Sequence, residues 1–312
     1  MFSAQINLKT IHRYIKKLYP QSDPHELAQE IVSNFQFNDE QRLPTKSTDI
    51  WSEKDCLLIT YADTFLESQT KPLNNLNSFL TIDLNKIFRM IHILPFFPYS
   101  SDDGFAVMDY EKVRDDLGDW KDIRKISDSF KIVGDVVINH ISRQHNWFQQ
   151  FIESKEPGKN FIKTCPPGTD VTKVIRPRNS DLLSETDTVD GKRLVWCTFS
   201  HDQIDLDFSK PEMLIEFIKL FKFYYDQGIR IYRLDAVGFI WKESGTSCLN
   251  LPKVHELVKL IRAVTDIAPE PILLLTETNV PNHENLQYFG NGNEAHMIYN
   301  FSLPPLLVHA LL

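Results

Sequence analysis

The stretch IRIYRLDAVGFIWKE (residues 229–243) joins a core strand to a charged end. Ile229, Ile231, Arg233 and Asp235 fall on one face at the two-residue period of a β-strand. The first two are apolar residues that fill a core, whereas the last two carry full charges. This pattern predicts a strand that is buried where it begins and presents functional groups where it ends.

Strands and helices alternate along the chain after about residue 55. Helices are expected over residues 76–88, 119–130, 210–228 and 251–268. Near-continuous apolar strands in such an alternation predict a parallel sheet covered by helices. The expected strands lie at residues 56–63, 90–97, 131–140, 229–237, 272–279 and 296–303.

The sequence favours a (β/α)8 barrel over a doubly wound sheet. No GxGxxG or GxxxxGK[ST] motif follows the first strand, so the usual nucleotide-binding reason for a doubly wound sheet is missing. Barrel enzymes build their sites at the C-terminal ends of the strands, and about six of the eight strands are recognisable here. Polar or charged residues end several of them, namely Tyr61, Asp63, Asp135 to His140, Arg233, Asp235 and Glu277.

Four parts are expected along the chain. Residues 1–55 form an N-terminal helical extension, whose polar segment 41–49 leads into the barrel. Residues 56–140 and 207–312 form the first and second parts of the barrel. The intervening residues 141–206 are rich in Pro, Gly, Asp and Arg and are too many for a plain loop, so they are predicted to form a small subdomain over the active face.

The composition of the chain indicates which classes of partner it does not bind. The net charge of −8 and the pI near 5.7 argue against a nucleic-acid partner. The longest apolar runs are too short to span a bilayer, and the N-terminus lacks the apolar stretch of a secretory signal. The sequence therefore predicts a cytoplasmic protein with no membrane or nucleic-acid partner.

Asp235 and Glu277 end neighbouring strands of the predicted sheet. Two carboxylates about 5–5.5 Å apart suit retaining glycosyl transfer, with one as nucleophile and the other as acid and then base. Arg233 would keep such a nucleophile ionised. From spacing alone, an Arg–Asp ion pair that only locks the barrel rim has equal weight.

Three motifs at the strand ends, DVVINH (135–140), YRLDAV (232–237) and TETN (276–279), together resemble the signature regions of the alpha-amylase superfamily. ITYAD (59–63) and HILPFFPYSSDDGFAVMDY (92–110) are similar to its sucrose phosphorylase branch, especially to relatives acting on sucrose 6-phosphate or glucosylglycerate. The resemblance is extended by QIDLD (203–207) and KESGTS (242–247), and it covers residues 50–312.

The resemblance implies roles for individual residues. Asp235 would be the nucleophile that forms a β-glucosyl-enzyme, Glu277 the general acid and base, and Arg233 the residue that orients Asp235. Taken singly, each of the other matched positions also has a structural interpretation, such as a rim histidine or a core phenylalanine. The matched sugar-binding residues are Asp102 and His140 on the glucose hydroxyls, Phe105 and Phe239 in an aromatic cage, and Gln203 in the pocket.

The inserted segment adds an anion-binding hypothesis. Arg176 and Arg178 lie two residues apart around a proline, and arginine is suited to bidentate capture of phosphate or carboxylate. Two solvated loop arginines are the alternative. Inorganic phosphate is the implied co-substrate, beside a small carbohydrate, and no metal or organic cofactor is expected. Asp205 and Asp207 hint at calcium, but no ligand-dense loop accompanies them.

One element of the family pattern is missing. The superfamily carries a third carboxylate, an aspartate near the end of the seventh strand, and no aspartate follows Asp266 here. The resemblance therefore implies a retaining α-glucoside phosphorylase, a glycosyltransferase, that is C-terminally truncated and has little or no turnover in isolation. A second chain could complete the barrel. The alternatives are an amylase-like α-glucosidase or transglucosidase and a non-catalytic remnant.

Overall fold

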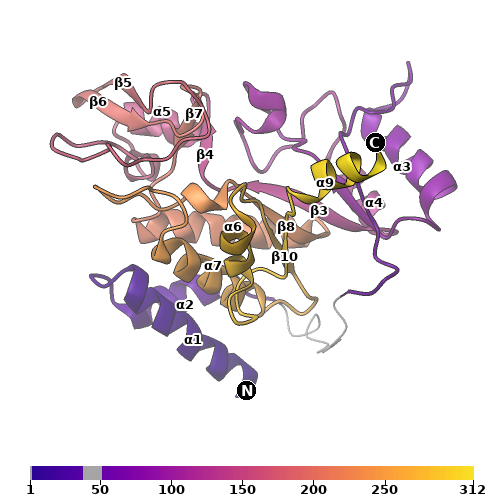
Figure 1. Cartoon of the computed structure of the whole chain (residues 1–312), viewed down its shortest axis with the longest axis horizontal. Helices are drawn as coiled ribbons and strands as arrows, with labels where there is room; N and C mark the ends of the chain where they lie inside the picture. Colours follow the sequence, from indigo (N-terminus) through magenta and orange to yellow (C-terminus); the bar gives the residue numbers. More distant parts are fainter. Residues whose placement is uncertain (1, 38–50) are drawn as a thin grey trace.

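A six-stranded sheet organises the chain, whose computed structural model describes residues 2–37 and 51–312 (Figure 1). Neighbouring strands are parallel throughout, and the order is β1-β2-β3-β8-β9-β10. All six predicted strands and their parallel arrangement are confirmed. Their bounds are β1 Leu57–Thr60, β2 Met90–Ile93, β3 Lys131–Val137, β8 Ile229–Asp235, β9 Leu273–Thr276 and β10 Met297–Ile298.

The four predicted helices between the strands are also present, and their ends follow local sequence signals. The side chain of Asp119 caps the N-terminus of one, while the Asp122 side chain bonds back to the Asp119 amide. Another begins at Pro211 and is followed by Gly228, whose φ of 91° suits glycine at a helix end. These helices are α3 Pro72–Phe79 with a π-helical extension Leu80–Leu84, α4 Trp120–Ser127, α6 Pro211–Asp226 and α7 Pro252–Thr265.

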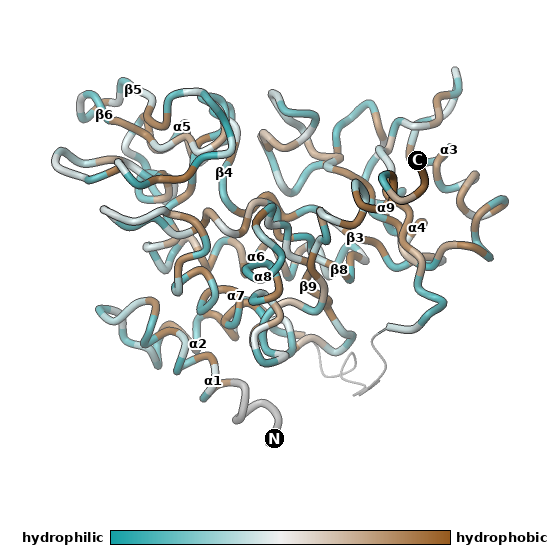
Figure 2. The backbone as a smooth tube through the Cα atoms, in the orientation of Figure 1, coloured by the Kyte–Doolittle hydropathy of each residue, from teal (hydrophilic) through white to brown (hydrophobic). Residues whose placement is uncertain are grey.

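The two faces of the sheet bury different kinds of side chain. The outer face, with Tyr232 and Leu234 of β8, joins the large apolar core beneath the helices. The inner face holds a second, small apolar cluster of Met90, Val133, Ile231, Leu273 and Leu275. The hydropathy colouring shows the apolar strands in the middle of the molecule (Figure 2).

Ile229 was predicted to lie on the inner face with Ile231, and that prediction is wrong. The register between β3 and β8 shifts at this point, so that Ile132 pairs with Ile229 but Val133 pairs with Ile231. Arg230 is the extra residue of this bulge, which reverses the alternation of side chains for the residues before it. Ile229 consequently packs into the helix-covered core.

Two helices of the predicted N-terminal extension pack on the helical layer. Helix α1 (Phe2–Leu18) lies against α7, and α2 (Pro24–Asn34) lies against α6 (Figure 1). An ion pair of 2.8 Å joins Lys17 to Glu256 of α7. The predicted linker at 41–49 lies outside the described residues.

The inserted segment carries two small antiparallel sheets, β4–β7 and β5–β6. It forms the unit drawn at the upper left of Figure 1, beyond the C-terminal ends of β3 and β8. His140 begins β4 and pairs with Asp205 of β7, so this unit starts directly at the end of the barrel strand β3. Its elements are β4 His140–Ser142, α5 Asn146–Ile152, β5 Leu183–Thr188, β6 Gly191–Trp196 and β7 Gln203–Asp205.

Within the described residues the sheet is an open half-barrel, because its edge strands β1 and β10 are not paired with each other. The last helix, α9 (Leu303–Leu311), is apolar and has no buried residue (Figure 2). Leu306, Leu307 and Leu311 expose 55% to 77% of their surface.

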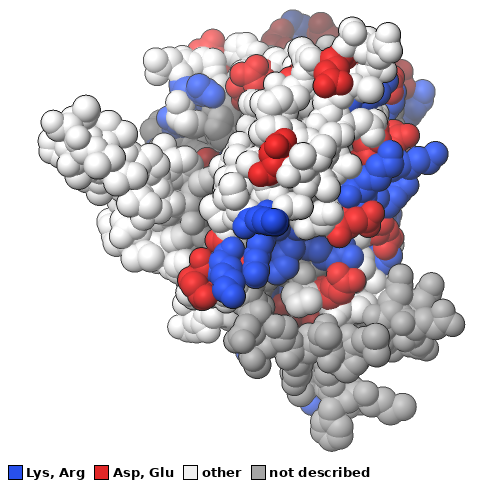
Figure 3. Space-filling view, turned by 90° about the vertical axis from the view of Figure 1, so that its right-hand side faces the viewer, with Lys and Arg blue, Asp and Glu red and all other residues white. Residues whose placement is uncertain are grey.

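The face turned toward the viewer in Figure 3 carries basic and acidic side chains in adjacent groups. No described helix is both long enough and apolar enough to cross a membrane. Short helical segments also occur at Asp102–Gly104, Gly158–Asn160, Val237–Phe239, Asn282–Asn285 and Leu286–Phe289.

Candidate active site

Asp235 and Glu277 lie at the C-terminal ends of adjacent strands. Asp235 is the last residue of β8, and Glu277 directly follows β9. The Glu277 amide donates to the Leu234 carbonyl (3.2 Å), which continues the ladder, and the Ala236 amide donates to Glu277 Oε2 (3.0 Å). The predicted placement of both carboxylates on neighbouring strand ends is therefore observed.

Arg233 joins two carboxylates with one nitrogen. Its Nη1 donates to Asp235 Oδ1 and to Asp135 Oδ1, at 2.7 Å in each case. Burial alone would lower the pKa of Arg233, but the negative charges of Asp235 and Asp135 outweigh burial and raise it above its usual value. The guanidinium thus stays charged, and it fixes the position of the Asp235 carboxylate.

Asp135 is the buried support of this arrangement. Its Oδ2 lies 2.8 Å from His92 Nε2, and its side chain is fully buried. Burial acts to raise the pKa of Asp135, yet His92 and Arg233 hold it below its usual value. The observed partners of Asp135 are His92 and Arg233, so it supports the arginine that holds Asp235. His92 itself was missed; its signal is a histidine inside the apolar strand MIHI.

Glu277 lies in surroundings that favour its protonated form. Burial and the negative charge of Asp235 raise its pKa above the usual glutamate value, with Arg233 acting in the opposite direction. A carboxyl group with a raised pKa beside one held by an arginine is the arrangement that assigns acid and nucleophile to two carboxylates. The site can therefore supply a proton from Glu277 while Asp235 is oriented by Arg233.

Four predicted sugar-binding residues come together above the nucleophile strand. Gln203 Nε2 donates to Asp102 Oδ2 (2.9 Å) and lies 3.1 Å from His140 Nε2. The same His140 nitrogen lies 3.1 Å from the carbonyl oxygen of Phe105. Asp102 has a φ of 57°, in the left-handed region that non-glycine residues rarely adopt. This strained backbone conformation holds the partly exposed carboxylate of Asp102 beside Gln203.

Aromatic rings flank these polar groups. The Phe105 ring lies 5.4 Å from the Arg233 guanidinium, and Tyr299 covers Arg233 at the same distance. Phe239 packs on Phe199 with ring centres 5.5 Å apart. Phe199 and Tyr299 were not predicted, because their positions depend on the folding of the inserted segment and of the last strand. The partly buried rings of Phe105, Phe199 and Phe239 could contact the faces of a sugar.

The two candidate arginines differ in their surroundings. Arg176 donates to Ser180 Oγ (3.1 Å) and to the carbonyl oxygens of Cys197 (3.2 Å) and Thr198 (3.4 Å), so it ties its loop to the residues that follow β6. Arg178 is 57% exposed and lies 3.8 Å from Asp102. Arg178 lines a hollow of about 430 Å³ together with Asp102 and Gln203.

Asp205 and Asp207, which hinted at calcium, both face ammonium groups. Lys242 Nζ lies 2.7 Å from Asp205 Oδ2, and Lys163 Nζ lies 3.4 Å from Asp207. Among the described residues, no group of three or more His, Cys, Asp or Glu side chains is arranged to hold a metal ion.

Comparison with known proteins identifies the family. The model of the alpha-amylase catalytic domain matches residues 84–310. The chain belongs to the alpha-amylase family. The glucosylglycerate phosphorylase of Allomeiothermus silvanus is 48% identical over 260 residues, which are 83% of this chain and 47% of that protein. The glucosylglycerate phosphorylase of Spirochaeta thermophila is 46% identical over 271 residues, 87% of this chain and 45% of that protein.

A solved structure of the same family agrees with this fold. The crystal structure of sucrose 6F-phosphate phosphorylase from Thermoanaerobacter thermosaccharolyticum superposes with a TM-score of 0.75 at 29% identity. The match covers 86% of this chain and 56% of that one. The chain thus spans about half the length of the curated relatives it matches.

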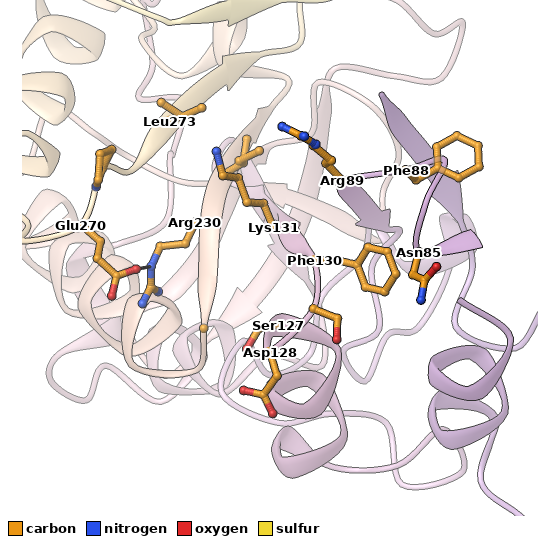
Figure 4. A pocket seen from close by; sticks show the side chains of 14 residues that line it. Asn85, Phe88, Arg89, Ser127, Asp128, Phe130, Lys131, Arg230, Glu270 and Leu273 are labelled. Atoms are coloured by element: carbon orange, nitrogen blue, oxygen red, sulfur yellow. Dashed lines mark hydrogen bonds and ion pairs between the residues drawn. The ribbon is translucent and has the colours of Figure 1, made fainter. Parts of the chain in front are cut away.

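In this alpha-amylase family chain, another cavity lies away from these groups. It measures about 700 Å³ and is lined by residues at the N-terminal ends of the strands, including Lys131, Arg230 and Leu273 (Figure 4). Arg230 there pairs with Glu270 at 2.8 Å. Barrel enzymes place their chemistry at the opposite end, so the candidate active site stays with Asp235 and Glu277.

Proposed function

We propose that this chain carries the glucosyl-transfer groups of a retaining α-glucoside phosphorylase. The donor is a glucosylglycerate-like or sucrose-like glucoside, and inorganic phosphate is the acceptor. The observation that supports this most strongly is the Arg233–Asp235 pair beside Glu277 at adjacent strand ends. The names of the relatives support phosphorolysis over hydrolysis, since those that match at 44% to 48% identity include three glucosylglycerate phosphorylases.

In the first step of the proposed reaction, the Asp235 carboxylate attacks the anomeric carbon of the glucosyl group. The bond from that carbon to the leaving oxygen breaks, and Glu277 gives its proton to this oxygen. A covalent β-glucosyl-enzyme results. The raised pKa of Glu277, caused by burial and Asp235, favours the protonated carboxyl group that this step requires.

In the second step, a phosphate oxygen attacks the same carbon from the face that the leaving group vacated. The bond to Asp235 breaks, and Glu277 takes the proton of the attacking phosphate. Two inversions at one carbon give α-glucose 1-phosphate and restore both carboxyl groups. His140, Gln203 and Asp102 would hold the glucose hydroxyls in both steps.

The hollow beside Arg178 is the proposed position of the anionic group. Arg178 is exposed there, and its nearest charged partner, Asp102, is 3.8 Å away, which leaves the guanidinium able to bind an anion. Both inorganic phosphate and the carboxylate of a glycerate leaving group carry suitable charge. Arg176 would support the inserted segment, because its Nη2 already donates to Ser180 and to the carbonyl oxygens of Cys197 and Thr198.

Product analysis with and without phosphate tests this function. The purified protein is incubated with glucosylglycerate, and in parallel with sucrose, and both glucose 1-phosphate and free glucose are quantified. Phosphorolysis predicts glucose 1-phosphate that depends on added phosphate. Free glucose formed equally well without phosphate would replace the proposal with a hydrolase, and robust release of glucose 1-phosphate would contradict the expectation of little or no turnover.

The anion site has its own test. Arg178→Ala is expected to raise the KM for phosphate about tenfold or more, since a charge-assisted contact contributes about 1.5–3 kcal/mol. Arg193→Ala removes the same charge from an exposed position of the same inserted segment and is the matched control. Equal KM values for the two variants would contradict the assignment of Arg178.

A further inference from the structure

Lys242 is a buried lysine that the proposed reaction does not use. It follows the turn after the nucleophile strand, and its side chain is only 2% exposed. Its Nζ lies 2.7 Å from Asp205 Oδ2 and 2.7 Å from Asn139 Oδ1. Lys242 therefore ties the loop after β8 to the end of β3 and to β7 of the inserted segment.

The chemistry of the lysine fixes the orientation of the Asn139 amide. An ammonium group donates hydrogen bonds and accepts none, so the Asn139 atom that faces Lys242 has to be the oxygen. Burial lowers the pKa of Lys242 below its usual value, while the Asp205 carboxylate, 2.7 Å from Nζ, acts in the opposite direction and favours the charged ammonium. The other amide atom of Asn139, the donor Nδ2, then points at His140 Nδ1, 3.3 Å away.

The orientation of Asn139 in turn decides where His140 carries its proton. Burial lowers the pKa of His140, so the imidazole is neutral near pH 7 and has one N–H. Nδ1 faces a donor and has to accept, which places the hydrogen on Nε2. Nε2 then donates toward the Phe105 carbonyl oxygen, 3.1 Å away, at the edge of the sugar pocket.

Gln203 is the one neighbour that favours the other tautomer. Its Nε2 also lies 3.1 Å from His140 Nε2 and would donate to an unprotonated nitrogen there. However, that arrangement would set an Nδ1–H of His140 against the Asn139 NH2 group. Gln203 keeps Asp102 as the acceptor for one of its two amide hydrogens (2.9 Å), whereas Asn139 cannot turn without placing its NH2 against Lys242.

We propose that Lys242 is a positioning residue that sets the tautomer of His140 through the amide of Asn139. The pocket is thereby given an N–H donor at His140 next to the acceptor carboxylate of Asp102. A hydroxyl group bound between them would share the His140 N–H with the Phe105 carbonyl oxygen and donate to Asp102. This last step rests on the proposed function, but the tautomer does not.

Nitrogen-15 NMR of the histidine side chains in the full chain, without any sugar, measures the tautomer directly. His140→Gln assigns the signals of His140 by their loss. The expected spectrum of the unsubstituted protein has a protonated Nε2 and an unprotonated Nδ1. A protonated Nδ1 would overturn the proposal. Because no substrate or turnover is involved, the outcome of the activity assay that tests the proposed function does not affect this measurement.

Two substitutions test the cause. Lys242→Met frees the Asn139 amide, and loss of the Nε2–H signature in part or all of the protein is expected. Lys163→Met, which removes the neighbouring lysine that faces Asp207, is the matched control and should leave the tautomer unchanged. An unchanged His140 spectrum in Lys242→Met, or the same change in Lys163→Met, would overturn the proposal.

Asn139→Asp decides the matter if Lys242→Met does not fold. This variant keeps an acceptor for Lys242 and presents a second carboxylate oxygen to His140 Nδ1. A proton on Nδ1 is the expected result. Persistence of an unprotonated Nδ1 opposite a carboxylate would mean that the Asn139 position does not control the tautomer.

Discussion

The two faces of β8 differ in what holds their side chains, although both are buried. Outward-facing Tyr232 and Leu234 are enclosed by apolar groups under the helices. Inward-facing Arg233 and Asp235 are 9% and 7% exposed, and they are held by hydrogen bonds between opposite charges. Apolar burial stabilises a fold, whereas buried ion pairs contribute little net stability and are expensive to break. The outer face thus serves the fold and the inner face serves the site.

The largest expected effect comes from the inner face. Asp235→Asn keeps the size of the side chain but removes the proposed nucleophile, so glucosyl transfer should fall by about 10⁴-fold or more. The measurement is kcat for the donor that the product analysis identifies. Asp128→Asn, at an exposed position by the opposite end of the strands, is the control. Comparable rates for the two variants would contradict the role of Asp235.

Replacing one leucine by alanine on each face of the sheet compares how much packing on that face contributes to stability. Leu234→Ala in β8 removes an outward side chain that is fully buried, and it should lower the free energy of unfolding by about 2–5 kcal/mol. Leu275→Ala in β9 acts on the small inner cluster, which has five buried members and is much smaller than the core beneath the helices. Because the space left there can be filled by solvent or collapse, a cost at or below about 2 kcal/mol is expected. Denaturant titration measures both, and an equal or larger cost at Leu275 would break the comparison.

Lowering the pH should place a positive charge on a buried histidine, His145. His145 packs against Tyr110 and Trp147, and burial lowers its pKa to about 4. The unfolded state, with a histidine pKa of about 6.5, binds more protons between these values. The contribution of His145 to the free energy of unfolding should therefore be fully present above pH 6.5. It should fall by on the order of 3 kcal/mol on going to pH 4.

His145→Asn isolates this contribution, because asparagine keeps an N-cap for α5 but does not titrate. The fall in unfolding free energy with decreasing pH should become shallower in this variant. His296, whose pKa burial also lowers to about 4, would account for part of the remaining slope. His283→Asn, at a side chain that is 78% exposed, is the control and should not alter the slope. An unchanged slope in His145→Asn would contradict the assignment.

The smallest expected effect is a shift in a pH profile. Burial and Asp235 raise the pKa of Glu277, and the protonated form acts as the acid, so the rate should fall as pH rises through this raised pKa. The falling limb should lie above the usual glutamate pKa of about 4.3. α-Glucosyl fluoride needs no proton on its leaving group and should show no such limb in the first step. A common limb for both donors would exclude Glu277 as the acid.

Local patterns in the sequence predicted most of the fold. The apolar strands, the helix signals at Asp119, Pro211 and Gly228, and the polar strand ends are short-range features, and each was found where expected. The neighbouring ends of β8 and β9 followed from strand order alone. The prediction for Ile229 failed because a bulge depends on pairing with another strand, which a single segment does not record.

The supporting part of the site could not be predicted for the same reason. His92 reaches Asp135 across the register of β2 and β3, and Phe199 reaches Phe239 from the inserted segment. Lys242 meets Asn139 over a separation of 103 residues. Such contacts depend on how strands and loops are placed in space. By contrast, Asp235 and Glu277 each lie within a short motif of consecutive residues.

Trapping the proposed intermediate tests the central claim most directly. Glu277→Gln is incubated with α-glucosyl fluoride in the absence of phosphate, so that the glucosyl-enzyme can form but its breakdown lacks the base. Intact-mass and peptide analysis should find one glucosyl group, attached to Asp235, and none in the Glu277→Gln/Asp235→Asn double variant. A label on another residue, or no label while the fluoride is consumed, would contradict the account.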